Sequence, residues 1–194
     1  MAISGDQSVF QRRLESHKAV FSRVPELESS VAQAAAILIE ALKNDKTVLM
    51  CGNGGSASDA MHFVAELVGR FIKERQGLPA IALNSTNSTL TAVANDYSYD
   101  IVFSRQVEAF AAQSGVLVAI STSGNSRSIV AAARSAQAAG IRVIGLTGEA
   151  GGELRALCDV CLCAPSSVTA TIQEVHIFLI HVLCELIDEV FAPH

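Results

Sequence analysis

The chain of 194 residues has no tryptophan, only four prolines and an aromatic content of 5%. It also lacks a proline-, glycine- or serine-rich tract, a run of like charges and an internal repeat, so the sequence shows no linker between domains. A chain of this length can bury one sizeable core but is short for two full domains. We therefore predict a single domain over residues 1–194.

An excess of positive charge is also missing, because 14 Lys and Arg stand against 19 Asp and Glu for a net charge of -5. This balance argues against broad attraction to nucleic acid or to an anionic membrane, although a small anion can still bind locally. Polar residues interrupt the long apolar stretches before they reach the length of a membrane span. We expect neither nucleic acid nor membrane as a partner, and we interpret the apolar content of 50% as subunit interface.

The N-terminal segment lacks the apolar core of a secretory signal, so we expect a cytoplasmic protein whose five cysteines are reduced. Cys158, Cys161 and Cys163 are spaced closely enough to suggest a metal or redox cluster. They fall, however, in a segment with the composition of a buried strand, where cysteine serves as a small apolar residue. We interpret them as structural thiols.

Hydrophobic periodicity predicts the order of the helices and strands. Apolar residues recur at helical spacing over residues 7–23 and 29–44, which indicates two amphipathic helices before any strand. Short β-rich runs then alternate with helical segments, at residues 48–51, 80–83, 116–120, 143–146 and 160–163. This alternation predicts an α/β fold, a parallel sheet of about five strands between two layers of helices.

The two ends of the chain are predicted to serve oligomer packing. Residues 1–45 would supply the leading helices, and residues 46–194 the α/β core. Residues 171–191 at the end of this core are apolar almost all round. A helix without a polar face is buried, and we expect this one in the core of an oligomer.

A glycine-rich segment, CGNGGSASD from Cys51 to Asp59, follows the first predicted strand and precedes a helix. Closely spaced glycines let the backbone approach a ligand, and the N-terminus of a helix offers free N–H groups to an anion. The alternative is a tight turn in which Ser56 or Ser58 caps the helix. The motif alone leaves both interpretations open.

A serine-rich segment, STSGNS from Ser121 to Ser126, follows the third predicted strand and again precedes a helix. Its four hydroxyls and its backbone N–H groups could hold a phosphate without a lysine. The alternative is N-capping by Ser123 or Ser126, which needs only one hydroxyl. The number of hydroxyls favours phosphate binding.

Candidate metal ligands occur on two predicted helices. His62 and Glu66 are four residues apart and project from one face, as a two-ligand arm or as an ordinary surface pair. Polar residues that need partners interrupt the apolar last helix at Gln173, Glu174, His176, His181 and Glu185. Periodicity alone does not choose the ligands among them.

The motifs GNGGSASDAMHFVAEL, STSGNS, AND at residues 94–96 and IQEVHIFLIH, in this order, resemble the sugar isomerase (SIS) domain family. The resemblance covers nearly the whole chain. It implies a flavodoxin-like fold with a five-stranded parallel sheet, and a homotetramer with active sites at subunit junctions. Within the family, it implies an isomerase that interconverts sedoheptulose 7-phosphate and D-glycero-D-manno-heptose 7-phosphate for ADP-heptose and the lipopolysaccharide core.

The resemblance also assigns roles to residues. It implies one zinc ion per subunit, bound by His62, Glu66, Gln173 and His181. The residues that it implies in sugar-phosphate binding are Asn53, Gly54, Gly55, Ser56, Glu66, Asn95, Asp96, Ser121, Thr122, Ser123, Ser126 and Gln173. Some family members carry an acid at the position of Ala170, so any role of that acid does not transfer to this chain.

Conversion of a ketose to an aldose moves one proton between C1 and C2 and another between their oxygens, through an enediol or enediolate. The reaction needs a base at carbon, an acid at oxygen and a group that stabilises the oxyanion. We assign Glu66 as the carbon base and His181 as the acid or partner base. Arg70 could reach the substrate or form a salt bridge at the helix end.

Three alternative functions remain open. The first is a non-catalytic relative that binds the replication initiator, the second a sugar-phosphate sensor that regulates transcription, and the third an isomerase for another sugar phosphate. Retention of Glu66, Gly55 and Ser123 favours an enzyme over the first.

Overall fold

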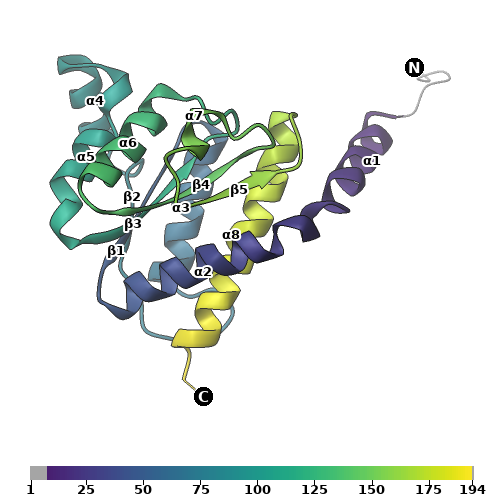
Figure 1. The fold of residues 1–194 in the computed structure, drawn as a ribbon, viewed down its shortest axis with the longest axis horizontal. Helices are drawn as coiled ribbons and strands as arrows, with labels where there is room; N and C mark the ends of the chain where they lie inside the picture. Colours follow the sequence, from purple (N-terminus) through teal and green to yellow (C-terminus); the bar gives the residue numbers. More distant parts are fainter. Residues whose placement is uncertain (1–7, 194) are drawn as a thin grey trace.

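Two helices lead the chain in the computed structural model, which describes residues 8–193. Helix α1 (Val9–Phe21) and helix α2 (Glu28–Lys43) are joined by the 3-10 turn η1 (Val24–Leu27). They confirm the two predicted helices, although the predicted start at residue 7 lies outside the described residues. Figure 1 shows α1 projecting away from the body of the molecule.

The sheet has five strands that pair in parallel in the order β2-β1-β3-β4-β5. The strands are β1 (Thr47–Gly52), β2 (Ala80–Ala82), β3 (Ser114–Ile120), β4 (Arg142–Gly148) and β5 (Val160–Ala164). This confirms the predicted flavodoxin-like α/β fold. The strand order reverses between β1 and β3, and ligands of open α/β sheets bind beyond the carboxyl ends of the strands at such a switch point. The two motif-bearing segments follow β1 and β3.

Helices cover both faces of the sheet, as expected for a three-layer fold (Figure 1). On what we call the first face, α2, α3 (Gly55–Val68) and α8 (Thr169–Phe191) pack against strand residues such as Val48 and Met50. On the second face, α5 (Ser104–Phe110), α6 (Arg127–Ala138) and α7 (Gly152–Arg155) pack against the alternate residues, such as Leu49 and Cys51. Helix α4 (Asn87–Asp96) precedes the 3-10 turns η2 (Tyr99–Ile101) and η3 (Ala111–Gln113), which flank α5.

Helix α8 buries one side and leaves apolar residues on the other. Its buried side packs on α2, α3 and β4, whereas Phe178, Leu186 and Val190 are exposed. A groove of about 470 Å³ runs between α8 and the leading helices, beside Phe21 and Val24. By length and composition alone, α8 is the one helix within residues 8–193 that could cross a membrane, a test that core helices also pass. The absence of a membrane partner therefore stays a prediction.

Two of the three clustered cysteines lie on the edge strand β5 as the composition predicted, whereas the prediction of a strand is wrong for Cys158. Cys161 and Cys163 lie on β5 with their sulfur atoms 3.6 Å apart, and Cys158 precedes the strand. A hydrogen bond with Cys158 and burial raise the pKa of Cys161 to about 11, which keeps the thiol protonated. This supports structural thiols, because the thiolate is the form that reacts and binds metals.

Candidate active site

The glycine loop (residues 51–55) turns the chain from β1 into α3. Gly54 is the N-cap residue of α3 and has a φ of 57°, a conformation that side chains disfavour. No side chain within the described part of the chain caps this helix, so the alternative in which Ser56 or Ser58 caps it is wrong. The first N–H groups of α3 therefore face the switch point without a side-chain acceptor.

Two side chains that the sequence analysis missed hold the glycine loop in place. Asn84 accepts a hydrogen bond from the N–H of Gly52 at 3.2 Å and donates to its carbonyl at 2.7 Å. Tyr99 donates its hydroxyl to Oδ1 of Asn53 at 2.8 Å. Asn84 lies just after β2, and a polar residue at the end of a strand could have indicated a role in the site. No feature of the local sequence indicated Tyr99.

Asn53 also connects the glycine loop with the second motif. Its Nδ2 donates to the hydroxyl of Ser128 at 3.0 Å, and Ser128 lies in the first turn of α6, directly after the serine loop (residues 121–126). The two loops that the sequence predicted to bind substrate are therefore bridged by a side chain. This bond places them at one edge of the sheet, as the strand order requires.

The hydroxyls of the serine loop are directed into the loop itself. The hydroxyl of Ser121, which is buried, donates to that of Ser126 at 3.2 Å, and the Ser123 hydroxyl accepts from the N–H of Asn125 at 3.1 Å. Ser126 is the N-cap residue of α6, but its side chain forms no capping bond to any described residue. The capping alternative is therefore wrong for Ser126, and its hydroxyl, which accepts from Ser121, can still donate to a ligand.

Backbone hydrogen bonds to β4 and α7 fix the serine loop. Thr122 accepts from the N–H of Gly148 at 3.0 Å, and Gly124 accepts from that of Leu154 at 2.9 Å. Gly124 has a φ of 66°, and a Cβ there would overlap the carbonyl of Gly151. The loop therefore presents its hydroxyls from a rigid frame of main-chain atoms.

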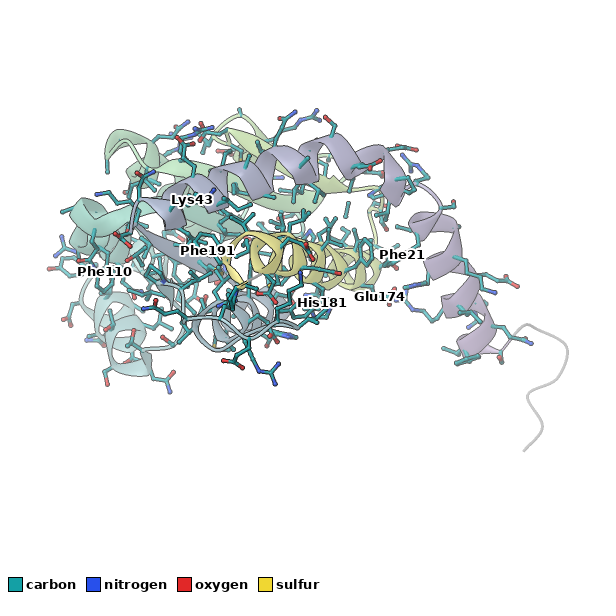
Figure 2. The ribbon with its side chains drawn as sticks, turned by 90° about the horizontal axis from the view of Figure 1, so that it is seen from below. Phe21, Lys43, Phe110, Glu174, His181 and Phe191 are labelled. Carbon is teal, nitrogen blue, oxygen red and sulfur yellow. The ribbon has the colours of Figure 1, made fainter. Side chains whose placement is uncertain are left out.

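Three of the four predicted metal ligands lie together between α3 and α8. His62 Nε2 and Glu66 Oε1 are 2.9 Å apart on α3, and the ring of His62 meets that of His181 edge to face at 5.3 Å between centroids. Phe71 also stacks on the ring of His181, at 5.4 Å between centroids. Figure 2 shows His181 midway along α8. The first face of the sheet thus carries the proposed acid and base.

The fourth predicted ligand, Gln173, lies two turns earlier on α8 and against the glycine loop. A Cβ at Gly55 would overlap the amide nitrogen of Gln173, so the close approach of these residues depends on the missing side chain. Gly55 therefore has a packing reason to be glycine. Gln173 joins the glycine loop to the helix that carries His181.

The donor set fits a divalent metal. No three His, Cys, Asp or Glu side chains of residues 8–193 converge as a finished metal site, and His62 bonds to Glu66 instead. Imidazole, carboxylate and amide groups nevertheless suit zinc, and His62 and Glu66 are exposed enough to turn toward an ion. One turn before His62, Oδ2 of Asp59 is buried and has no hydrogen-bond partner among residues 8–193. Burial raises the pKa of Asp59, and His62 partly offsets the rise.

Other sequence candidates lie apart from this cluster. Asn95 donates to Asp96 at 2.9 Å at the exposed end of α4, and no hydrogen bond within residues 8–193 joins this pair to either loop. Arg70 pairs with Glu74 at 3.4 Å, in agreement with the salt-bridge alternative. His176 is fully buried and bonds to the carbonyl of Thr147 at 3.0 Å, as a core histidine does.

Comparisons with known proteins agree with the geometry. A family model of the SIS domain matches residues 14–148. The phosphoheptose isomerase of Campylobacter concisus is 50% identical over 185 residues, which cover 95% of this chain and 98% of that protein.

Two solved structures extend the match to three dimensions. The phosphoheptose isomerase of Neisseria gonorrhoeae is 42% identical with a TM-score of 0.84, over 93% of this chain and 100% of that one. A phosphoheptose isomerase of Francisella tularensis is 37% identical with a TM-score of 0.87, over 93% and 96% of the two chains.

Proposed function

The chain belongs to the SIS domain family and, within it, to the phosphoheptose isomerases, and from this premise we propose how its residues divide the reaction. The proposed reaction interconverts sedoheptulose 7-phosphate and D-glycero-D-manno-heptose 7-phosphate. The observation that carries the proposal is the meeting of α3 and α8, where His62, Glu66 and His181 come together and Gln173 packs on the glycine loop.

The serine loop is proposed to hold the phosphate. Its support is the hydroxyl of Ser126, which caps no helix, together with the buried hydroxyl of Ser121 beside it. Hydroxyl and backbone donors at a helix N-terminus suit a phosphate dianion. Bound there, the phosphate would hold the far end of the sugar, so that binding energy remote from the reacting carbons orients C1 and C2.

Glu66 is proposed to move the proton between C1 and C2, and His181 to move the proton between their oxygens. A carboxylate can take a proton from carbon, and an imidazole titrates near neutral pH and can both give and accept one. Phe71 against the ring of His181 restricts its rotation, which favours a fixed direction of proton transfer.

His62, Glu66, Gln173 and His181 are the residues proposed to hold one zinc ion per subunit. A divalent metal supplies Lewis acidity that polarises the sugar carbonyl or orients the neighbouring hydroxyl. A carboxylate that binds a metal is a weaker base, so Glu66 would have to shift its coordination or bind such an ion more loosely in order to serve as the base. The exposure of its side chain, 23%, leaves room for that movement.

We also propose a homotetramer in the cytoplasm that supplies heptose phosphate for ADP-heptose and the lipopolysaccharide core. The apolar residues Phe178, Leu186 and Val190 on the outer side of α8 support an oligomer, since they form part of a surface that a second subunit can cover.

Direct conversion of sedoheptulose 7-phosphate by the purified protein tests the function. We expect turnover in the wild type, its loss in Glu66→Gln and a fall on treatment with a chelator that added zinc reverses. The matched control is Glu74→Gln, which changes an exposed glutamate of the next segment and should leave turnover unchanged. A folded, zinc-loaded wild type without turnover would contradict the proposal.

A further inference from the structure

The segment that leaves α3 contains a buried arginine between exposed residues. Residues 69–79 have no regular structure, and residues 72–77 are exposed apart from Arg75. The side chain of Arg75 is 0% exposed, and its Nε lies 2.7 Å from Oδ1 of Asp188 in α8, whose side chain is 1% exposed. An ion pair buried in this way needs every donor and acceptor matched, because a charge is costly to remove from water.

The terminal nitrogens of Arg75 donate hydrogen bonds to carbonyl groups at the end of α3. Its two terminal nitrogens donate to the carbonyl of Glu66 at 2.8 Å and to that of Leu67 at 2.9 Å, and one also reaches the carbonyl of Gln76 at 3.1 Å. The last carbonyls of a helix have no partner within the helix and carry its partial negative charge. Arg75 therefore caps the turn of α3 that carries Glu66.

Both carboxylate oxygens of Asp188 also accept hydrogen bonds. Its Oδ2 accepts from the backbone N–H groups of Ile72 and Lys73, both at 2.9 Å, while its Oδ1 accepts from Arg75. Burial alone would raise the pKa of this carboxyl, but the two backbone donors and Arg75 hold it below its usual range. The carboxylate thus fastens the segment to α8.

The ion pair connects the two helices that carry the acid and the base. Asp188 stands seven residues, or about two turns, beyond His181 on α8. Arg75 binds the main chain of Glu66 itself. Apolar packing between α3 and α8 is not directional, whereas these hydrogen bonds fix how far one helix lies along the other.

We propose that Arg75 and Asp188 are positioning residues for the isomerisation, which set the place of Glu66 relative to His181 across the substrate. This inference rests on the proposed function. An error of about 1 Å in the position of a catalytic group can cost about 100-fold in rate. The pair acts through the backbone of Glu66 and through α8, and no hydrogen bond among residues 8–193 joins its side chains to the glycine loop or the serine loop.

The test compares kcat and KM in Arg75→Met, Arg75→Lys and Asp188→Asn with the wild type, all zinc-loaded. Arg75→Met should lower kcat by about 100-fold. It should change KM by less than about twofold, because the serine loop that is proposed to hold the phosphate is intact. Arg75→Lys keeps the charge but lacks the planar fork that spans two carbonyls, so we expect kcat to recover by about tenfold over Arg75→Met. The kcat of Asp188→Asn should lie between the kcat values of Arg75→Met and Arg75→Lys.

Two controls separate positioning from simple stability. Glu189→Gln breaks the exposed ion pair with Lys73, 2.6 Å long, which joins the same segment to α8, and it should leave kcat unchanged. Ile129→Val lowers stability on the second face by about 1 kcal/mol and should also leave kcat unchanged. Amide hydrogen exchange in the last turn of α3 should quicken in Arg75→Lys and in neither control.

The outcomes distinguish the two proposals. Wild-type turnover together with an unchanged kcat in folded Arg75→Lys and Asp188→Asn overturns the positioning role alone. A fall in kcat that Ile129→Val reproduces at equal stability overturns it as well. A wild type without turnover overturns the proposed function and this inference with it.

Discussion

The two faces of the sheet position their functional groups by different means. On the first face, α3 and α8 present side chains, His62, Glu66 and His181, and a buried ion pair joins the two helices. At the end of β3, the serine loop, which leads into α6 on the second face, is held by main-chain bonds to β4 and α7. Proton transfer depends on the exact place of a few side-chain atoms, whereas a phosphate can be held by many equivalent donors.

This difference predicts that substitutions on the first face lower kcat and that substitutions on the second face raise KM. The largest effect should come from His181→Gln, which removes the imidazole ring but keeps a polar side chain. We expect kcat to fall by about 10³-fold with little change in KM, since general acid and base groups contribute on that scale. Steady-state kinetics of the zinc-loaded protein measure both constants.

The control for His181 is Glu185→Gln, one turn later on α8 and exposed. It should retain the kcat of the wild type. An increase in KM without a fall in kcat for His181→Gln would contradict the assignment of proton transfer to the first face.

A smaller loss should follow from Gly55→Ala. The new Cβ would collide with the amide of Gln173 and displace it from the site, so we expect kcat to fall by about 30-fold while the fold survives, because only the end of a flexible side chain must move. Kinetics of a double-mutant cycle with Gln173→Ala measure the coupling.

If Gly55 acts through Gln173, adding Gly55→Ala to Gln173→Ala should cost little more. If the losses of kcat from the two substitutions are fully additive, Gly55 acts only through the main chain of the loop and not through Gln173.

The fold was predictable to a large extent because it depends on hydrophobic patterning. All five strands and the first, second and last helices lie within a few residues of their predicted bounds, since Val- and Ile-rich runs such as 116–120 carry their own signal. The parallel direction of the strands was predicted from the alternation of helix and strand together with the resemblance to the SIS family, whereas their order in the sheet was not predicted.

The site was predictable only in part. Sequence motifs named His62, Glu66 and Gln173, but motifs carry no distances, and the partners that hold them lie far away in the chain. Arg75 looks like any surface residue of a polar segment, and its burial arises only when α8, 113 residues later, supplies Asp188. Asn84 and Tyr99 are likewise brought to the glycine loop by the sheet and by η2.

On the second face, Ser126→Ala removes a hydroxyl that is proposed to bind phosphate and makes no capping bond in the described structure. We expect KM to rise by about tenfold, the scale of one hydrogen bond to a charged group, with kcat within about twofold. Inhibition by inorganic phosphate should weaken in parallel. The control is Ser22→Ala at the end of α1, whose hydroxyl bonds to the carbonyl of Ala19. A fall in kcat alone would place Ser126 in the chemistry.

The smallest effect concerns a buried group of the first face that takes no part in the chemistry. Burial lowers the pKa of His176 from 6.5 to about 4, although its bond to the carbonyl of Thr147 opposes the shift. The imidazole of His176 therefore takes up a proton near pH 6.5 in the unfolded chain but only near pH 4 in the folded chain. Stability therefore falls as the pH falls toward about 4, and roughly 0.8 kcal/mol of this loss occurs from pH 7.5 to pH 6.

Urea unfolding of the wild type and His176→Gln at pH 7.5 and pH 6 checks this sign. The variant cannot titrate here, so its free energy of unfolding should be lower at pH 7.5 but should fall less between the two values. Because His176 lies beside Gln173 on α8 yet faces β4, kcat should keep the pH profile of the wild type. Parallel losses of stability in both proteins would assign the pH dependence to other groups, and a shifted rate profile would mean that the core side of α8 communicates with its catalytic side.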